Sequence, residues 1–225
     1  MGHAVGQLIP LAVGVALSPL PIIAVILVLT SGGGRVSGSS FLAGWMSALA
    51  VLGTAVLLVA DEAHASSSGT TAAWVGVLQL VLGILLVGVA AQQWTGRPRG
   101  DAEPELPGWM EKVETFTPAR AAAVAAGFAA VKPKNLLLTI AAGAAIAESG
   151  GGAARQAGAM VFFVVLASVG IAAPVAIHVF MGERAGSILA GMRAWLVRES
   201  QTIVAVICLI MAAKLIGDGI GALAS

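Results

Sequence analysis

The sequence predicts an all-α membrane protein with six transmembrane helices, built as two inverted three-helix repeats, with both termini outside and with helices 1 and 4 broken. Three observations predict this fold. The composition is too apolar for a soluble protein, six apolar runs are long enough to cross a bilayer, and a proline-centred break falls at the midpoint of the first and the fourth run. Paired broken helices are typical of folds that bind a ligand between two halves.

The composition limits the class of protein. Apolar side chains make up 58% of the 225 residues, whereas charged residues account for 10%, against about 25% in an ordinary soluble domain. So few charges cannot cover the surface of a soluble fold, which excludes a soluble enzyme, a nucleic-acid binder and a disordered protein. The single cysteine, Cys208, excludes an intramolecular disulfide and a dithiol redox relay. The start of the chain lacks the basic region of a cleavable signal peptide, so we expect the first apolar run to be retained.

Each apolar run has roughly the 20 residues that an α-helix needs to cross the hydrocarbon core. The runs cover residues 7–31, 41–60, 72–92, 119–147, 157–181 and 201–222. The loops 32–40, 93–118 and 182–200, with the adjacent span end, carry eight Lys or Arg residues, whereas the opposite side carries only Arg155. The positive-inside rule therefore predicts that these loops are cytoplasmic and that both termini lie outside.

Two of the cytoplasmic loops contain short amphipathic stretches. Apolar side chains recur at helical spacing beside charged ones at residues 109–116 and 188–198. This pattern predicts interfacial helices on the inner leaflet, with simple anchoring by Trp and Arg favoured over lipid recognition.

The two halves of the chain are weakly similar. Ser18-Pro19-Leu20-Pro21 in the first span parallels Lys132-Pro133-Lys134-Asn135 in the fourth, Val75–Leu80 parallels Val204–Leu209, and Gly88 falls on Gly217. Residues 1–92 then form the first three-helix repeat, 93–118 a cytoplasmic linker with a short amphipathic helix, and 119–225 the second repeat. Because three spans is an odd number, the repeats enter the membrane in opposite senses. The alternative is that the prolines only kink long helices.

The breaks carry the candidate binding chemistry. Proline disfavours helix at the residue before it, so we expect Ser18, Leu20 and Lys132 to be extended. A new half-helix starts after each break, and two such N-termini facing each other near the midplane suit an anion. Lys132 and Lys134 add charges that cost at least about 2.5–3.5 kcal/mol each at the bilayer centre, and such residues usually mark a substrate pathway. The alternative is that a lysine pairs with a carboxylate or reaches an interface. The candidate substrate-binding residues are Ser18, Pro19, Pro21, Lys132, Pro133, Lys134 and Asn135.

A few other polar residues lie within the spans. Lys214 and Asp218 share a helix face, as a structural ion pair or as a coupling or gating couple. His178 and Gln79 are the other two possible coupling or gating residues. His178 fits a capped or interfacial histidine better than a proton relay, and Gln79 fits an interhelical hydrogen bond. The small-residue pair Gly217 and Gly221 indicates tight helix packing or a homodimer. No cluster has metal-ligand spacing and no nucleotide-binding loop is present, so we expect neither a metal nor another cofactor.

The motifs at the breaks, Ser18-Pro19-Leu20-Pro21 and Lys132-Pro133-Lys134-Asn135, together with Pro107–Pro118 and Arg193–Leu196, resemble the GAP/Sap family of actinobacteria. These are the glycopeptidolipid- and sulfolipid-addressing proteins of the LysE transporter superfamily. The resemblance spans nearly the whole chain. It implies a multi-pass protein of the bacterial plasma (inner) membrane that exports a lipid or lipid-like anion, and it makes the residues at the breaks signature positions. The electron-carrying relatives need paired cysteines, which this chain lacks.

The sequence and the resemblance together predict a non-enzymatic transporter of an anionic lipid or glycolipid. The halves would rock about an anion site at the two breaks. One alternative is a LysE-like exporter of amino acids or another small solute, such as a small anion. Another is a scaffold that docks lipid-synthesis or export machinery through residues 93–118. The expected partners are membrane lipids and the transported anion, and a nucleic-acid partner is excluded.

Overall fold

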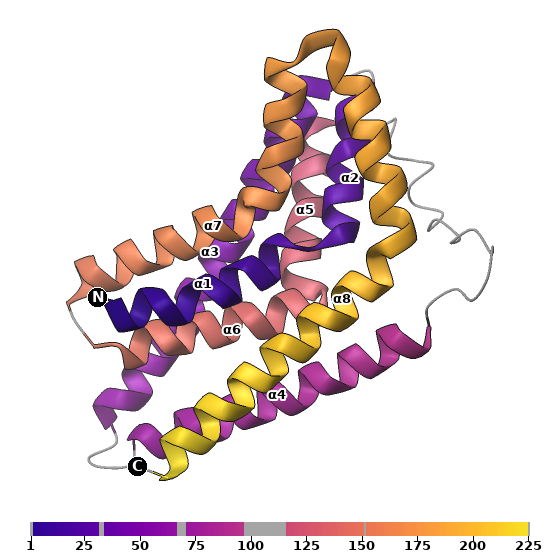
Figure 1. Ribbon diagram of the computed structural model, residues 1–225. Helices are drawn as coiled ribbons and strands as arrows, with labels where there is room; N and C mark the ends of the chain where they lie inside the picture. Colours follow the sequence, from indigo (N-terminus) through magenta and orange to yellow (C-terminus); the bar gives the residue numbers. More distant parts are fainter. Residues whose placement is uncertain (1, 32–33, 67–70, 97–115, 151, 225) are drawn as a thin grey trace.

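The computed structural model describes residues 2–31, 34–66, 71–96, 116–150 and 152–224 (Figure 1). Every regular element in these ranges is helical, which confirms the all-α prediction. The elements are α1 (Gly2–Ala16), α2 (Pro19–Thr30), α3 (Gly34–Ser66), α4 (Thr71–Thr95), α5 (Pro118–Val131), α6 (Pro133–Glu148), α7 (Ala153–Phe180), η2 (Gly182–Arg184) and α8 (Ala185–Ala224).

The helices are long and apolar enough for a multi-span membrane protein. Helices α3, α4, α7 and α8 each meet the length and hydropathy of a membrane span. The pair α1 and α2 is bent by 55°, and the pair α5 and α6 is bent by 71°. Counting each bent pair as one broken span brings the total to six, with the breaks where the prolines predict them.

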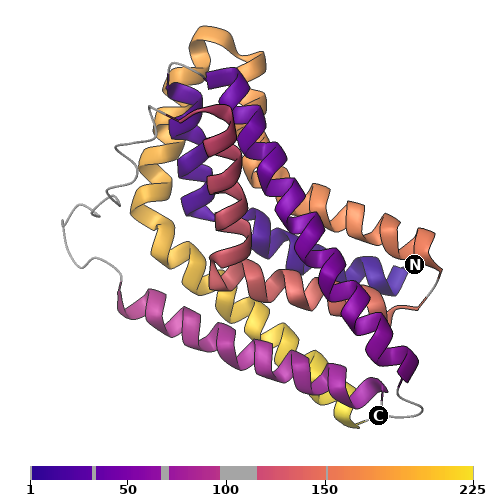
Figure 2. The same cartoon turned by 180° about the vertical axis from the view of Figure 1, so that it is seen from behind.

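Several helix ends gather at two ends of the molecule. The end of α2 and the start of α3 lie beside the end of α7 and the start of α8. The start of α1 and the end of α8 lie at the opposite end, with the end of α3 and the start of α4 (Figures 1 and 2). An even number of spans requires this arrangement. Which end faces the cytoplasm, and the division into two inverted repeats, remain predictions.

Glycines let particular helices approach closely. A Cβ atom on Gly219 of α8 would lie 2.7 Å from the carbonyl oxygen of Gly76 in α4, so this contact requires glycine. A Cβ on Gly170 of α7 would lie 2.0 Å from the Ala16 carbonyl oxygen at the end of α1. The predicted pair Gly217 and Gly221 makes no such contact, because nothing described lies within 4 Å of a Cβ built on either. The packing role expected of that pair inside the chain is therefore wrong.

Helix α8 corrects a second expectation. Residues 188–198, expected as a separate interfacial helix, are the first turns of a single 40-residue helix that continues through the last span. No proline interrupts this stretch, and its Leu, Met, Arg and Ala residues favour helix. Leu189 and Leu196 are buried against the rest of the fold. The stretch expected at 109–116 lies outside the described residues, apart from Phe116.

The protein is apolar inside and outside. Large side chains such as Phe41 and Trp45 of α3 and Phe163 of α7 fill the interior. The outer surface carries exposed Val51 and Val59 of α3 and Ile84 of α4. A soluble fold would place charge there, whereas hydrocarbon accepts these side chains, so the exposed surface agrees with a membrane environment.

Candidate functional site

The backbone is extended at both breaks, where the sequence predicts it. Ser18 has φ −108° and ψ 97°, and Lys132 has φ −67° and ψ 119°. Pro19 and Pro133 follow as the first residues of α2 and α6. Leu20, also expected to be extended, is helical instead. It precedes a proline in the first turn of α2, where a missing N–H removes no intrahelical hydrogen bond.

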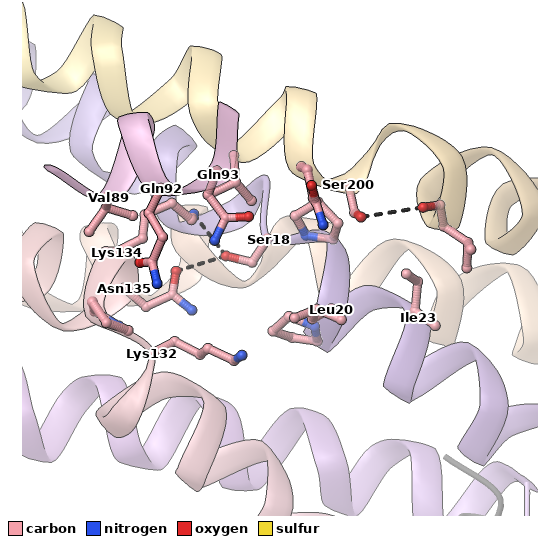
Figure 3. A pocket seen from close by; sticks show the side chains of 16 residues that line it. Ser18, Leu20, Ile23, Val89, Gln92, Gln93, Lys132, Lys134, Asn135 and Ser200 are labelled. Atoms are coloured by element: carbon pink, nitrogen blue, oxygen red, sulfur yellow. Dashed lines mark hydrogen bonds between the residues drawn. The ribbon is translucent and has the colours of Figure 1, made fainter. Parts of the chain in front are cut away.

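The two breaks meet at one cavity of about 470 Å³ (Figure 3). All seven predicted substrate-binding residues line it, contributed by segments more than 100 positions apart in the sequence. The other lining residues are Leu20, Ile23, Val89, Gln92, Gln93, Val197, Ser200, Gln201 and Val204. Helices α2, α4, α6 and α8 therefore build the cavity together, and none of the lining residues is acidic.

Helices α2 and α6 both begin at the cavity, and their axes diverge from it (Figure 1). Contrary to the prediction from the sequence, the two N-termini therefore do not point at each other. They lie next to each other at the same cavity. They differ in donors: prolines at positions 19 and 21 remove two N–H groups from the first turn of α2, whereas α6 lacks only that of Pro133. The first turn of α6 thus offers the stronger partial positive charge to an anion.

Lys134 connects the two breaks. Its side chain is only 6% exposed, and its Nζ donates hydrogen bonds to Ser18 Oγ at 2.9 Å and to the Gly14 carbonyl oxygen. Ser18 Oγ lies 2.8 Å from Asn135 Oδ1 and 2.7 Å from the Val15 carbonyl oxygen, and it can donate its one proton to either acceptor. Asn135 Nδ2 donates to the Phe128 carbonyl oxygen at 3.2 Å. A buried chain of hydrogen bonds thus runs from the end of α1 to the end of α5.

The two backbone acceptors in this chain are equivalent positions. Gly14 lies five residues before Pro19, and Phe128 lies five residues before Pro133. In an unbroken helix these carbonyl groups would accept from the N–H groups of Ser18 and Lys132. The breaks prevent those bonds, and the side chains of Lys134 and Asn135 supply the donors instead. A buried carbonyl without a partner would be costly, so the pair stabilises the broken geometry.

Lys132 behaves differently. It is exposed at the cavity, and Figure 3 shows its side chain extended into the open space. Its Nζ lies 5.9 Å from the centre of the Phe128 ring, a cation–π contact. Neither Lys132 nor Lys134 is paired with a carboxylate of the described residues, so the predicted alternative of an ion pair does not apply there.

Sequence reasoning missed four further polar residues that line the cavity. Gln92 and Gln93 of α4 and Ser200 and Gln201 of α8 line the cavity, and the Gln201 Oε1 atom is buried with no hydrogen-bond partner among the described residues. Both pairs lie at the boundary of an apolar run. The available signal was two consecutive polar residues at the end of a span. Polar residues at that position face solvent as often as they line a binding site.

The four proposed coupling or gating residues do not line the cavity. Lys214 and Asp218 form an ion pair within α8, as the structural alternative predicts. His178 lies in the last turn of α7 and packs closely against Gly34 at the start of α3. A Cβ atom added to Gly34 would lie 3.2 Å from His178 Nε2. Gln79 is buried in α4, but its Oε1 has no partner in the described part of the chain, so the expected interhelical hydrogen bond through that oxygen is absent. No cluster of three or more potential metal ligands occurs among the described residues.

Several apolar helices and a lysine-lined cavity at two helix breaks define the class of this chain as a multi-span, all-α membrane protein. The chain belongs to the Sap, sulfolipid-1-addressing protein, family, whose family model matches residues 8–221. Membership links it to lipid addressing and confirms the resemblance to the GAP/Sap family, while placement in the LysE superfamily remains a prediction. No curated protein and no solved structure matches the chain.

Proposed function

We propose that the protein exports an anionic lipid or lipid-like amphiphile across the bacterial inner membrane and binds its headgroup in the cavity at the two breaks. The observation that carries the proposal is the charge of the lining: two lysines and the α6 N-terminus without an acidic side chain. Uncompensated cations are costly in a low-dielectric environment. A sulfate, phosphate or carboxylate group would offset that cost.

The rest of the lining supports an amphiphile. Ile23, Val89 and Val204 give an apolar wall, and the amides of Gln92 and Gln201 can hydrogen-bond the polar atoms of a headgroup. A cavity of about 470 Å³ holds a headgroup but not the acyl chains of a lipid. The chains would have to leave it for the bilayer. Val131, next to Lys132 in the sequence, has a 75% exposed apolar side chain that such an acyl chain would contact.

Transport would use the predicted division into repeats. Residues 1–92 and 119–225 would rock against each other about the breaks, with 93–118 as the linker, and so expose the headgroup site first to one side and then to the other. The hydrogen-bond chain between the breaks supports this idea because it provides a fixed point shared by both halves. Neither the cavity nor the family membership calls for a catalytic step.

Binding tests the proposal directly. The protein, purified in a neutral maltoside detergent, is mixed with dodecyl phosphate, dodecanol or inorganic phosphate, and adducts are counted by native mass spectrometry. We expect selective retention of dodecyl phosphate and its loss in the Lys132→Ala/Lys134→Ala variant. Lys214→Ala removes a lysine outside the cavity and should retain the ligand. Equal retention of dodecanol, or normal retention by the double variant, would contradict the proposal.

A second candidate is export of a small anionic solute, because the cavity volume suits a complete molecule of drug size. The same assay separates the two. If inorganic phosphate competes as well as dodecyl phosphate binds, the alkyl chain contributes nothing and the substrate is a solute. If only dodecyl phosphate binds, reconstitution in vesicles and measurement of its movement between leaflets is the next step.

A further inference from the structure

We infer that the two lysines of the cavity have different tasks: Lys132 contacts the anion, whereas Lys134 is a positioning residue that fastens α6 to the break between α1 and α2. This assignment deepens the proposed function and rests on it. It also corrects the view that both lysines face the ligand equally, which their spacing in the sequence suggests. The separation follows from burial and from the partners of each ammonium group.

Lys134 is already occupied. Its Nζ has three donors, and two of them are used by Ser18 Oγ and the Gly14 carbonyl oxygen of the other break. The side chain is almost fully buried. An anion that drew Lys134 away would leave a buried carbonyl and a buried hydroxyl without their donor, and each unpaired group would oppose the movement. Lys134 therefore stays on the protein while a ligand binds.

Lys132 would lose few interactions by turning toward a ligand. It is exposed in the cavity, and its described interaction is the cation–π contact with Phe128, with 5.9 Å between Nζ and the ring centre. Its flexible stem can move the ammonium toward a headgroup without leaving a buried polar group unpaired. It also immediately precedes α6, whose first turn offers the stronger of the two N-terminal dipoles. An anion at this corner meets the charge and the helix end together.

The position of Ser18 supports the assignment. In the alignment of the two breaks, Ser18 is the counterpart of Lys132, and Leu20 is the counterpart of Lys134. The first repeat thus supplies a hydroxyl that receives the Lys134 bond, and it supplies no cation. Charge enters the site from the second repeat alone. The ligand is consequently held on the α6 side, and the α1–α2 break acts as its support.

A double-mutant cycle tests the two tasks. The variants are Lys132→Met, Lys134→Met and Ser18→Ala, with each lysine change also combined with Ser18→Ala. Two quantities are measured: the Tm in detergent and the preference for dodecyl phosphate over dodecanol in native mass spectrometry. We expect Lys132→Met to keep the Tm and to lower the preference by about tenfold, the loss of one contact to a charged group. Lys134→Met should lower the Tm and should affect both amphiphiles in parallel.

The cycle also distinguishes an effect of Lys134 through its bond to Ser18 from a general destabilisation of the fold. Lys134→Met and Ser18→Ala should be non-additive in Tm, because either change breaks the same bond, whereas Lys132→Met and Ser18→Ala should be additive. Should Lys134→Met not fold, Ser18→Ala carries the test: a lower Tm with a smaller change of preference than Lys132→Met supports the inference. An unchanged Tm in Lys134→Met or Ser18→Ala, or a loss of preference confined to Lys134→Met, overturns it.

Failure of the inference and failure of the proposed function give different results. If the wild type shows no preference for dodecyl phosphate, the proposed function fails, and the binding role of Lys132 fails with it. The Tm values of the Lys134 and Ser18 variants still report whether the hydrogen bond between these two residues stabilises the fold. If the wild type prefers dodecyl phosphate but Lys132→Met retains that preference, the proposed function stands and the assignment of Lys132 is wrong.

Discussion

The Nζ of Lys134 donates a hydrogen bond to the Oγ of Ser18 at 2.9 Å, although 116 positions separate the two residues in the sequence. Ser18 ends the break between α1 and α2, and Lys134 lies in the first turn of α6. The bond therefore holds two broken helices at a common point. Because the lining residues come from both sides of this point, the geometry of the cavity depends on it.

Removing the Ser18 hydroxyl should destabilise the protein. Ser18→Ala takes a partner from both Lys134 and Asn135, which are buried, and we expect a loss of about 1–3 kcal/mol in the free energy of unfolding. Ser168→Ala is the matched control, because that buried hydroxyl donates only within its own helix, to the Val164 carbonyl oxygen. Thermal or denaturant unfolding in detergent measures the difference. Equal effects of the two changes would contradict the role given to Ser18.

Two glycines of α8, two positions apart, should respond oppositely to alanine. A Cβ on Gly219 would lie 2.7 Å from the Gly76 carbonyl oxygen, so Gly219→Ala should force α4 and α8 apart and cost about 1–3 kcal/mol. Gly217→Ala meets nothing described within 4 Å and gains helix propensity, worth up to about 1 kcal/mol. Tm measurements on both variants decide. If Gly217→Ala is the more damaging change, the pair Gly217 and Gly221 contacts a second copy or another partner.

Replacing Gln201 should affect stability and ligand binding differently, because its buried Oε1 has no hydrogen-bond partner among the described residues. Gln201→Met removes a buried acceptor that has no described partner, so the Tm should stay equal or rise. The same change removes a polar group from the cavity wall, so a headgroup that donates hydrogen bonds should bind more weakly. Dodecyl phosphate below about pH 6, a monoanion with one P–OH donor, and methyl dodecyl phosphate, a monoanion without a donor, provide such a pair when compared by native mass spectrometry. A lower Tm in Gln201→Met would show that the oxygen has a partner after all.

The ion pair of α8 should tolerate the loss of both partners better than the loss of one. Lys214→Met leaves Asp218 as an uncompensated charge on a partly buried helix face, which costs more than removing both charges. Lys214→Met/Asp218→Leu should therefore unfold at a higher temperature than Lys214→Met. Neither variant should lose dodecyl phosphate, because both residues lie outside the cavity lining. Loss of the ligand in both variants would instead support the coupling role.

Much of the fold could be predicted from local signals. The apolar runs determine the spans, because a run of about 20 apolar residues is stable only across hydrocarbon. Pro19 and Pro133 determine the breaks, since each removes a helix hydrogen bond and restrains the residue before it. The interfacial helix expected at 188–198 was wrong for a related reason: charged residues alone do not end a helix when no proline or capping signal is present.

The candidate site was only partly predictable. Lys132 and Lys134 were predictable because a lysine within an apolar run is energetically costly, and such residues usually have a function. The amides of Gln92 and Gln201 did not, because a polar residue at a span boundary is ordinary. Likewise, Gly76 and Gly219 could not be distinguished from the exposed Gly217 and Gly221, since close approach is a property of two helices and not of one.

By itself, the sequence determined the class of protein, the number of apolar spans, the place of both breaks and the residue types available there, because these follow from composition, run length and the local chemistry of proline. Only the tertiary structure decided that the breaks meet, that Lys134 is bound to the opposite break and that Lys132 is open to the cavity. The physical reason is that both lysines flank the same proline, Pro133, and nothing in the local sequence shows which of them meets the other break. Their difference comes from Gly14 and Ser18, which only folding brings within hydrogen-bond distance of one of them.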